Sequence, residues 1–139
     1  MNTKLLLTAS AVLMALAGLG GTFAPAEFLA ALHLPSTGIL SLLIQLLAAL
    51  LLAFALANWT AKDSRIGGIY NRPLALGNLL HFTIGAITLS KYVVSHDAPM
   101  YVFIATLLYV VFALSFAKIT FMGSRTSEAP SRSDPPSAP

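Results

Sequence analysis

The sequence contains no cysteine and very little charge. Of its 139 residues only 9% are Asp, Glu, Lys or Arg, while 57% are hydrophobic; a soluble globular domain carries roughly 25% charged residues. The absence of cysteine excludes disulfides, thiolate metal sites and cysteine nucleophiles. The shortage of charge argues against a water-soluble domain, and the apolar content argues against intrinsic disorder. The eight basic residues form no stripe along the chain, so no nucleic-acid partner is expected.

Long apolar runs are what the sequence has in abundance. Four of them reach the roughly 20 residues that a helix needs to cross a bilayer core of about 30 Å. Because lipid leaves no partner for an unpaired backbone polar group, these runs predict an all-α membrane protein, a four-helix transmembrane bundle with up-down-up-down topology. The spans are expected at about residues 5–23, 38–58, 74–94 and 100–119.

The segments around these spans divide the chain further. The bundle is expected to occupy residues 1–121, with a short helix within Pro25–Leu34 at the outer membrane surface. Residues 122–139, rich in Ser and Pro, predict a disordered cytoplasmic tail. Residues 1–26 also resemble a secretory signal peptide, but their apolar part is longer than the usual 7–15 residues. We expect this segment to remain as the first span; its cleavage, which would leave three spans, is the alternative.

The basic residues predict the orientation. If the N-terminus is cytoplasmic, seven of the eight Lys and Arg residues lie on the cytoplasmic side and only Lys91 lies near the other face. Cytoplasmic loops carry the excess of Lys and Arg in membrane proteins. We therefore expect a multi-pass membrane protein with both termini in the cytoplasm.

Polar side chains within the spans are the candidates for function, because they are costly to place in lipid. On the third predicted span, Asn78, His81 and Thr88 follow a helical spacing and share one face. Gln45 on the second span and Tyr109 on the fourth would extend this polar thread if the faces converge. Two interpretations stay open: a site for an amphipathic ligand around His81, or interhelical hydrogen bonds that only hold the helices together.

Arg72 stands at the start of the third predicted span and is a candidate contact for a lipid phosphate or another anion. A positive charge that only sets the topology is the alternative. No metal site is expected, since three scattered histidines without cysteine cannot close a tetrahedral zinc site. His33 and His96 lie in outer loops, away from the depth of His81, so a haem held by two histidines is not expected either.

Several short motifs resemble those of the small four-helix DoxX-like membrane families of bacteria. They are Phe23–Leu29, Leu32–Pro35, Gln45–Ala49, Asn58-Trp59 and the pair Asn78 and His81, within about residues 5–120. The resemblance implies a small four-helix protein of the bacterial inner membrane. Some related families are subunits of quinone-linked oxidoreductases, so it also implies association with a larger assembly.

The predicted function is that of a small, non-catalytic integral membrane protein. It would bind an apolar ligand, a lipid or a quinone, or a partner subunit within the bundle; membrane lipids, a larger membrane assembly or a homo-oligomer are the expected partners. A subunit of a quinone-linked membrane oxidoreductase is the alternative, with His81 as acid–base group or as hydrogen-bond partner of the quinone. A small transporter is disfavoured, because no carboxylate lies in the middle of a span. Apart from a quinone, no cofactor is expected.

Overall fold

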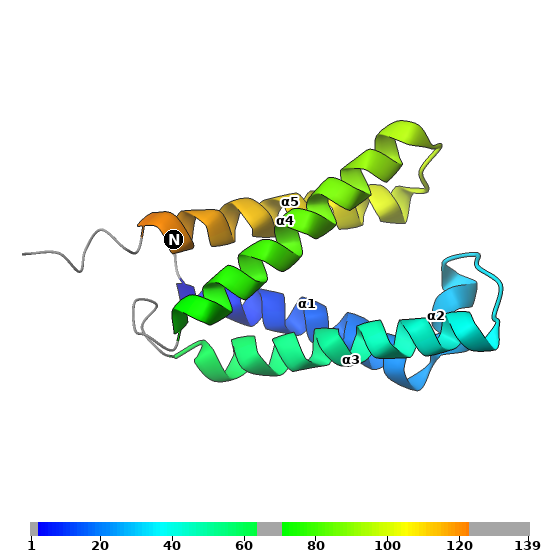
Figure 1. Ribbon diagram of the computed structural model, residues 1–139, viewed down its shortest axis with the longest axis horizontal. Helices are drawn as coiled ribbons and strands as arrows, with labels where there is room; N and C mark the ends of the chain where they lie inside the picture. The colour runs from blue at the N-terminus through cyan, green and yellow to red at the C-terminus, as the bar shows by residue number, and fades with distance from the viewer. Residues whose placement is uncertain (1–2, 64–70, 123–139) are drawn as a thin grey trace, which may run out of the picture.

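Four long helices and one short helix make up the computed structural model, which describes residues 3–63 and 71–122 (Figure 1). The helices are α1 (Thr3–Phe23), α2 (Pro25–Ala31), α3 (Gly38–Ala61), α4 (Asn71–Ser95) and α5 (Met100–Met122). Each predicted span lies inside one of the long helices, so the four-helix prediction is confirmed. The predicted tail lies almost entirely outside the described residues.

The four long helices are each long and apolar enough to cross a membrane. Large apolar side chains cover their outer faces: Leu16, Leu107 and Leu114 are each about two-thirds exposed. Such a surface is stable in lipid and not in water, because lipid tails are as apolar as the side chains that they touch. The chain is therefore a multi-pass membrane protein.

The short helix α2 and the start of α3 follow from local sequence. Pro25 occupies the first turn of α2, where its missing N–H and fixed φ are favourable. The helix ends as His33 takes a left-handed φ of 57°, and Leu34 N–H donates to the Leu29 carbonyl at 2.9 Å, a closure typical of helix C-termini. The Thr37 hydroxyl then accepts from Leu40 N–H at 3.3 Å and caps α3.

The long helices pack as two hairpins, α1 with α3 and α4 with α5. In the first hairpin the backbones approach closely at two glycines of α1. A Cβ on Gly18 would lie 2.7 Å from Leu52 Cγ, and one on Gly21 would lie 2.9 Å from Ala48 Cβ. Small residues allow this close contact between membrane helices, where packing rather than burial from water drives association.

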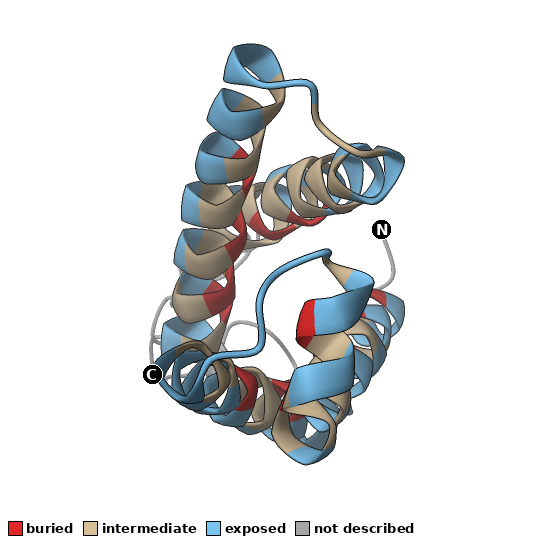
Figure 2. Ribbon diagram, turned by 90° about the vertical axis from the view of Figure 1, so that its right-hand side faces the viewer, coloured by how far each residue is buried: buried red, intermediate tan, exposed pale blue. Residues whose placement is uncertain are grey.

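The two hairpins meet mainly at one end of the bundle, the closed end, which holds the start of α1 and α4 and the end of α3 and α5. Its core contains Leu7, Met14, Phe82 and Phe116, among others, and Phe82 stacks on Phe116 with ring centroids 5.6 Å apart. At the opposite end, the open end, α4 diverges from α3 (Figure 1). Figure 2 views the molecule from the open end, and its buried residues face the interior of the bundle.

Candidate functional site

Three polar side chains from three helices meet at the closed end. Ser10 of α1, Asn58 of α3 and Asn78 of α4 are all fully buried. The Asn58 amide Nδ2 donates to Asn78 Oδ1 at 2.8 Å, and Asn78 Nδ2 donates back to Asn58 Oδ1 at 2.6 Å. Asn58 Nδ2 also donates to Ser10 Oγ at 3.1 Å, and Asn78 Nδ2 donates to the Leu74 carbonyl at 2.9 Å. We call these three residues the amide cluster.

The amide cluster leaves no N–H group unpaired. Each carboxamide has two N–H donors, and both donors of Asn58 and of Asn78 have a protein acceptor. The Ser10 hydroxyl donates in turn to the Leu7 carbonyl at 3.0 Å. For Asn78 this geometry matches the second interpretation of the sequence, hydrogen bonds that hold helices together. The sequence alone does not pair Asn58 with Asn78; the signal that it offers is an Asn at the end of one span and another near the start of the next.

His81 lies one helical turn beyond Asn78 and is surrounded by aromatic rings. Its ring centroid lies 5.7 Å from that of Phe54, 5.1 Å from that of Phe82 and 5.6 Å from that of Tyr109. The Tyr109 hydroxyl lies 3.3 Å from His81 Nε2 and donates to it when the imidazole proton is on Nδ1. This separation is long for a hydroxyl donor, whose hydrogen bonds are usually about 2.7–2.8 Å. The contact is therefore weaker than a hydrogen bond of ordinary length.

Gly85 allows Tyr109 to reach His81. The Tyr109 ring lies directly on the backbone of α4 at this glycine: a Cβ on Gly85 would lie 2.5 Å from Tyr109 Cδ1, which is far inside van der Waals contact. Only a residue without a side chain permits this placement of the ring. Gly85 is therefore part of the site although it carries no functional group.

A cavity of about 180 Å³ adjoins the Tyr109 ring, where all four long helices meet. Its lining is otherwise apolar, and Tyr109 is the lining residue that carries a hydroxyl, which lies 3.3 Å from His81 Nε2. The lining residues are Leu13, Met14, Ala17, Leu51, Phe82, Ala105, Leu108 and Tyr109. An apolar cavity of about 150 Å³ is large enough to hold one benzene-sized molecule.

The remaining candidates from the sequence lie elsewhere. Gln45 on α3 and Thr88 on α4 are both exposed, and neither lines the cavity beside Tyr109. Arg72 is exposed in the first turn of α4 at the closed end. Within residues 3–63 and 71–122, no group of three or more His, Cys, Asp or Glu side chains is placed to hold a metal ion. Of the predicted set, the structure joins His81 to Tyr109, with Asn78 one turn away in the amide cluster.

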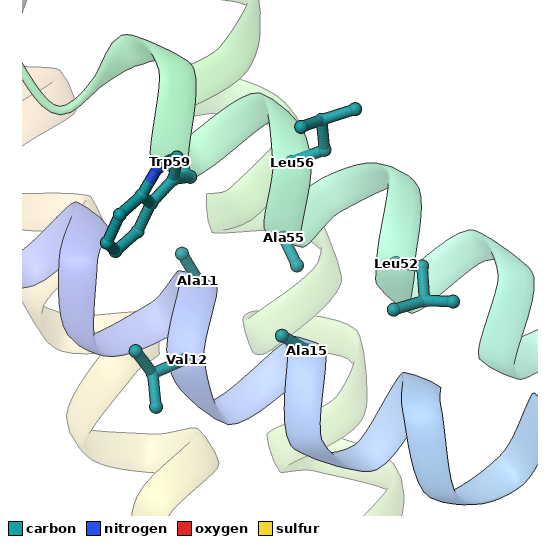
Figure 3. Close-up of a pocket in the computed structure, with 7 residues that line it drawn as sticks. All are labelled: Ala11, Val12, Ala15, Leu52, Ala55, Leu56 and Trp59. Carbon is teal, nitrogen blue, oxygen red and sulfur yellow. The ribbon is translucent and has the colours of Figure 1, made fainter.

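A second apolar hollow lies on the surface of α1 and α3 (Figure 3). It measures about 380 Å³ and is lined by Ala11, Val12, Ala15, Leu52, Ala55, Leu56 and Trp59. None of these residues lines the cavity beside Tyr109. We call this hollow the α1–α3 groove.

No family model, no curated protein and no solved structure matches the chain. The resemblance to DoxX-like families stays a prediction from the short motifs.

Proposed function

We propose that this chain is a small, non-catalytic protein of the bacterial inner membrane that binds an apolar, ring-bearing ligand of the quinone class inside its bundle. The observation that carries the proposal is the apolar cavity of about 180 Å³ beside the His81–Tyr109 pair. One six-membered ring fills such a volume. A quinone carbonyl would accept a hydrogen bond from the Tyr109 hydroxyl, which lies 3.3 Å from His81 Nε2. A plain acyl chain has no such acceptor, which favours a quinone over a lipid.

Binding accounts for the site better than catalysis does. The acidic residues of the described part of the chain are Glu27, Asp63 and Asp97, and all three lie outside the long helices. His81 therefore has no carboxylate beside it to orient the imidazole as an acid–base group. A subunit of a quinone-linked oxidoreductase remains the alternative function, because the same cavity would then present the quinone to a partner protein.

The distribution of charge supports the proposed orientation. Lys4, Lys62, Arg72 and Lys118 lie at the closed end, and Lys91 lies toward the open end. Since basic residues concentrate on the cytoplasmic side, we place the closed end in the cytoplasm.

The test is a thermal-shift series on the purified protein with a short-chain ubiquinone as the probe. A ligand at about 100 times its Kd stabilises the folded state by about 2.7 kcal/mol, so we expect a clear rise in Tm for the wild type. Tyr109→Phe removes one hydrogen-bond donor, worth about 0.5–1.5 kcal/mol, and we expect roughly fivefold weaker binding. His81→Leu should reduce the shift as well, because Tyr109 then loses the partner that positions its hydroxyl.

Tyr92→Phe is the matched control, because Tyr92 is an exposed tyrosine near the open end of α4, the helix that carries His81. It should leave the ubiquinone-induced shift at the wild-type value. Equal shifts in the wild type, Tyr109→Phe and His81→Leu contradict the proposal. A larger protein that copurifies in stoichiometric amount together with quinone would favour the oxidoreductase subunit.

A further inference from the structure

The α1–α3 groove owes its shape to small side chains. Ala11 and Ala15 of α1 face Ala55 of α3 across it, and these three residues leave the volume of about 380 Å³ unfilled. Val12, Leu52 and Leu56 add only apolar atoms to its lining (Figure 3). The groove is open on the surface of the hairpin, so what occupies it comes from the membrane and not from the interior of the bundle.

One end of the groove differs chemically from the rest. In Figure 3, Trp59 stands at one end of the row of lining residues and Leu52 at the other. Lys62, which caps the C-terminus of α3, places its ammonium Nζ 3.0 Å from the centroid of the Trp59 ring. Tryptophan and lysine are the residues that anchor helices at the boundary between hydrocarbon and water. An apolar groove thus ends in an indole and a cation at the level of the lipid headgroups.

The charge at this end is positive. Asp63 forms a salt bridge of 2.7 Å with Lys4, and Lys62 acts on the same carboxylate more weakly, through space. Two lysine charges therefore lie near one carboxylate. A lysine ammonium has three N–H donors, and the indole face covers only one side of the Lys62 ammonium. An anionic group is the chemistry that fits its other side.

We propose that the α1–α3 groove binds one anionic phospholipid, with an acyl chain along the alanines and the headgroup phosphate at Lys62. The dimensions agree with this. From Leu52 to Lys62 a helix advances about 15 Å, which is half of a bilayer core of about 30 Å and therefore one leaflet. This site is separate from the cavity beside Tyr109, so the two proposals stand or fall independently.

Trp59 is the only tryptophan of the chain, and its fluorescence reports on this site alone. The full chain is reconstituted in phosphatidylcholine vesicles that contain a minor fraction of one brominated lipid, either phosphatidylglycerol or phosphatidylcholine. Brominated acyl chains quench tryptophan fluorescence on contact. We expect brominated phosphatidylglycerol to quench Trp59 at about fivefold lower mole fraction than brominated phosphatidylcholine. This factor is equivalent to roughly 1 kcal/mol for one basic side chain near an anionic lipid.

Lys62→Gln should abolish the preference for phosphatidylglycerol, with quenching expressed relative to the unquenched emission of the same variant. Lys118→Gln is the matched control: Lys118 is an exposed lysine at the same end of the bundle, on α5 and outside the groove. It should retain the fivefold preference. If both variants behave alike, the effect is general attraction to the surface and the proposal is wrong.

Ala15→Leu tests the position of the acyl chain. The larger side chain fills part of the groove, so we expect weaker quenching by both brominated lipids while Lys62 is unchanged. Unaltered quenching in this variant would overturn the proposal. So would wild-type quenching that does not distinguish the two lipids, which is the result expected if a second copy or another membrane helix occupies the groove.

Discussion

Two interhelical polar contacts lie one turn apart on α4, and they differ in nearly every physical respect. Asn78 is fully buried, and the amide N–H groups that it and Asn58 contribute are all hydrogen-bonded, to one another or to Ser10 Oγ and the Leu74 carbonyl. His81 is only partly buried and shares one contact of 3.3 Å with Tyr109, beside a cavity. A network in which every N–H group is already hydrogen-bonded stabilises the fold and has no donor left for a ligand. A ligand that replaces the long contact between His81 and Tyr109 gives up little hydrogen-bond energy.

The largest effect is expected from breaking the amide cluster. Asn78→Leu leaves the buried carbonyl of Asn58 without a partner and one of its N–H groups with only the weak acceptor Met14 Sδ, 3.8 Å away; an unpaired buried polar group costs about 1–3 kcal/mol. We expect a loss of about 2–3 kcal/mol in the free energy of unfolding, measured by reversible denaturation in mixed micelles.

The double variant Asn58→Leu/Asn78→Leu sharpens this test. Because replacing both partners by apolar groups leaves no unpaired amide, it should cost less than the sum of the two single variants. Ser10 keeps its bond to the Leu7 carbonyl in this variant. Strictly additive losses would show that the two amides do not depend on each other.

A smaller effect is expected at Gly85. Its Cβ would collide with the Tyr109 ring, so Gly85→Ala should displace the ring, separate Tyr109 from His81 and cost about 1–2 kcal/mol from overpacking. Gly77→Ala is the control on the same helix, because its Cβ would lie 3.4 Å from the nearest atom of Phe54, an ordinary contact. Equal stability of the two variants in the same denaturation assay would contradict the placement of the Tyr109 ring.

The smallest loss of stability is expected at the exposed Lys4–Asp63 salt bridge, because water screens the attraction between its two charges. The hydrogen bond from Lys4 holds the pKa of Asp63 below its ordinary value of 3.8. The stabilisation is therefore complete above pH 3.8 and is lost as the pH falls through the lowered pKa. Tm measured against pH should show a slight deficit for Asp63→Asn at neutral pH that disappears in acid. The deficit of Asn78→Leu should persist, since amides do not titrate.

The sequence predicts the four spans because their length and continuous apolar character are local properties that the bilayer thickness selects. It also places Asn78 and His81 on one face, which is a matter of helical period alone. The sequence does not show that Asn78 and His81 have different roles. Their roles depend on the side chains packed against them from other helices, Asn58 of α3 against Asn78 and Tyr109 of α5 against His81. No local pattern encodes the rotation of one helix against another.

Four apolar helices and a positively charged end can thus be predicted from the amino-acid sequence. The three-dimensional packing is needed to see that Asn78 holds the hairpins together, that Gly85 makes room for Tyr109, and that Gln45 and Thr88 do not line the cavity. Lipid selects each helix separately by its apolar length, whereas the packing between helices is set by small residues and hydrogen bonds that join positions far apart in the chain.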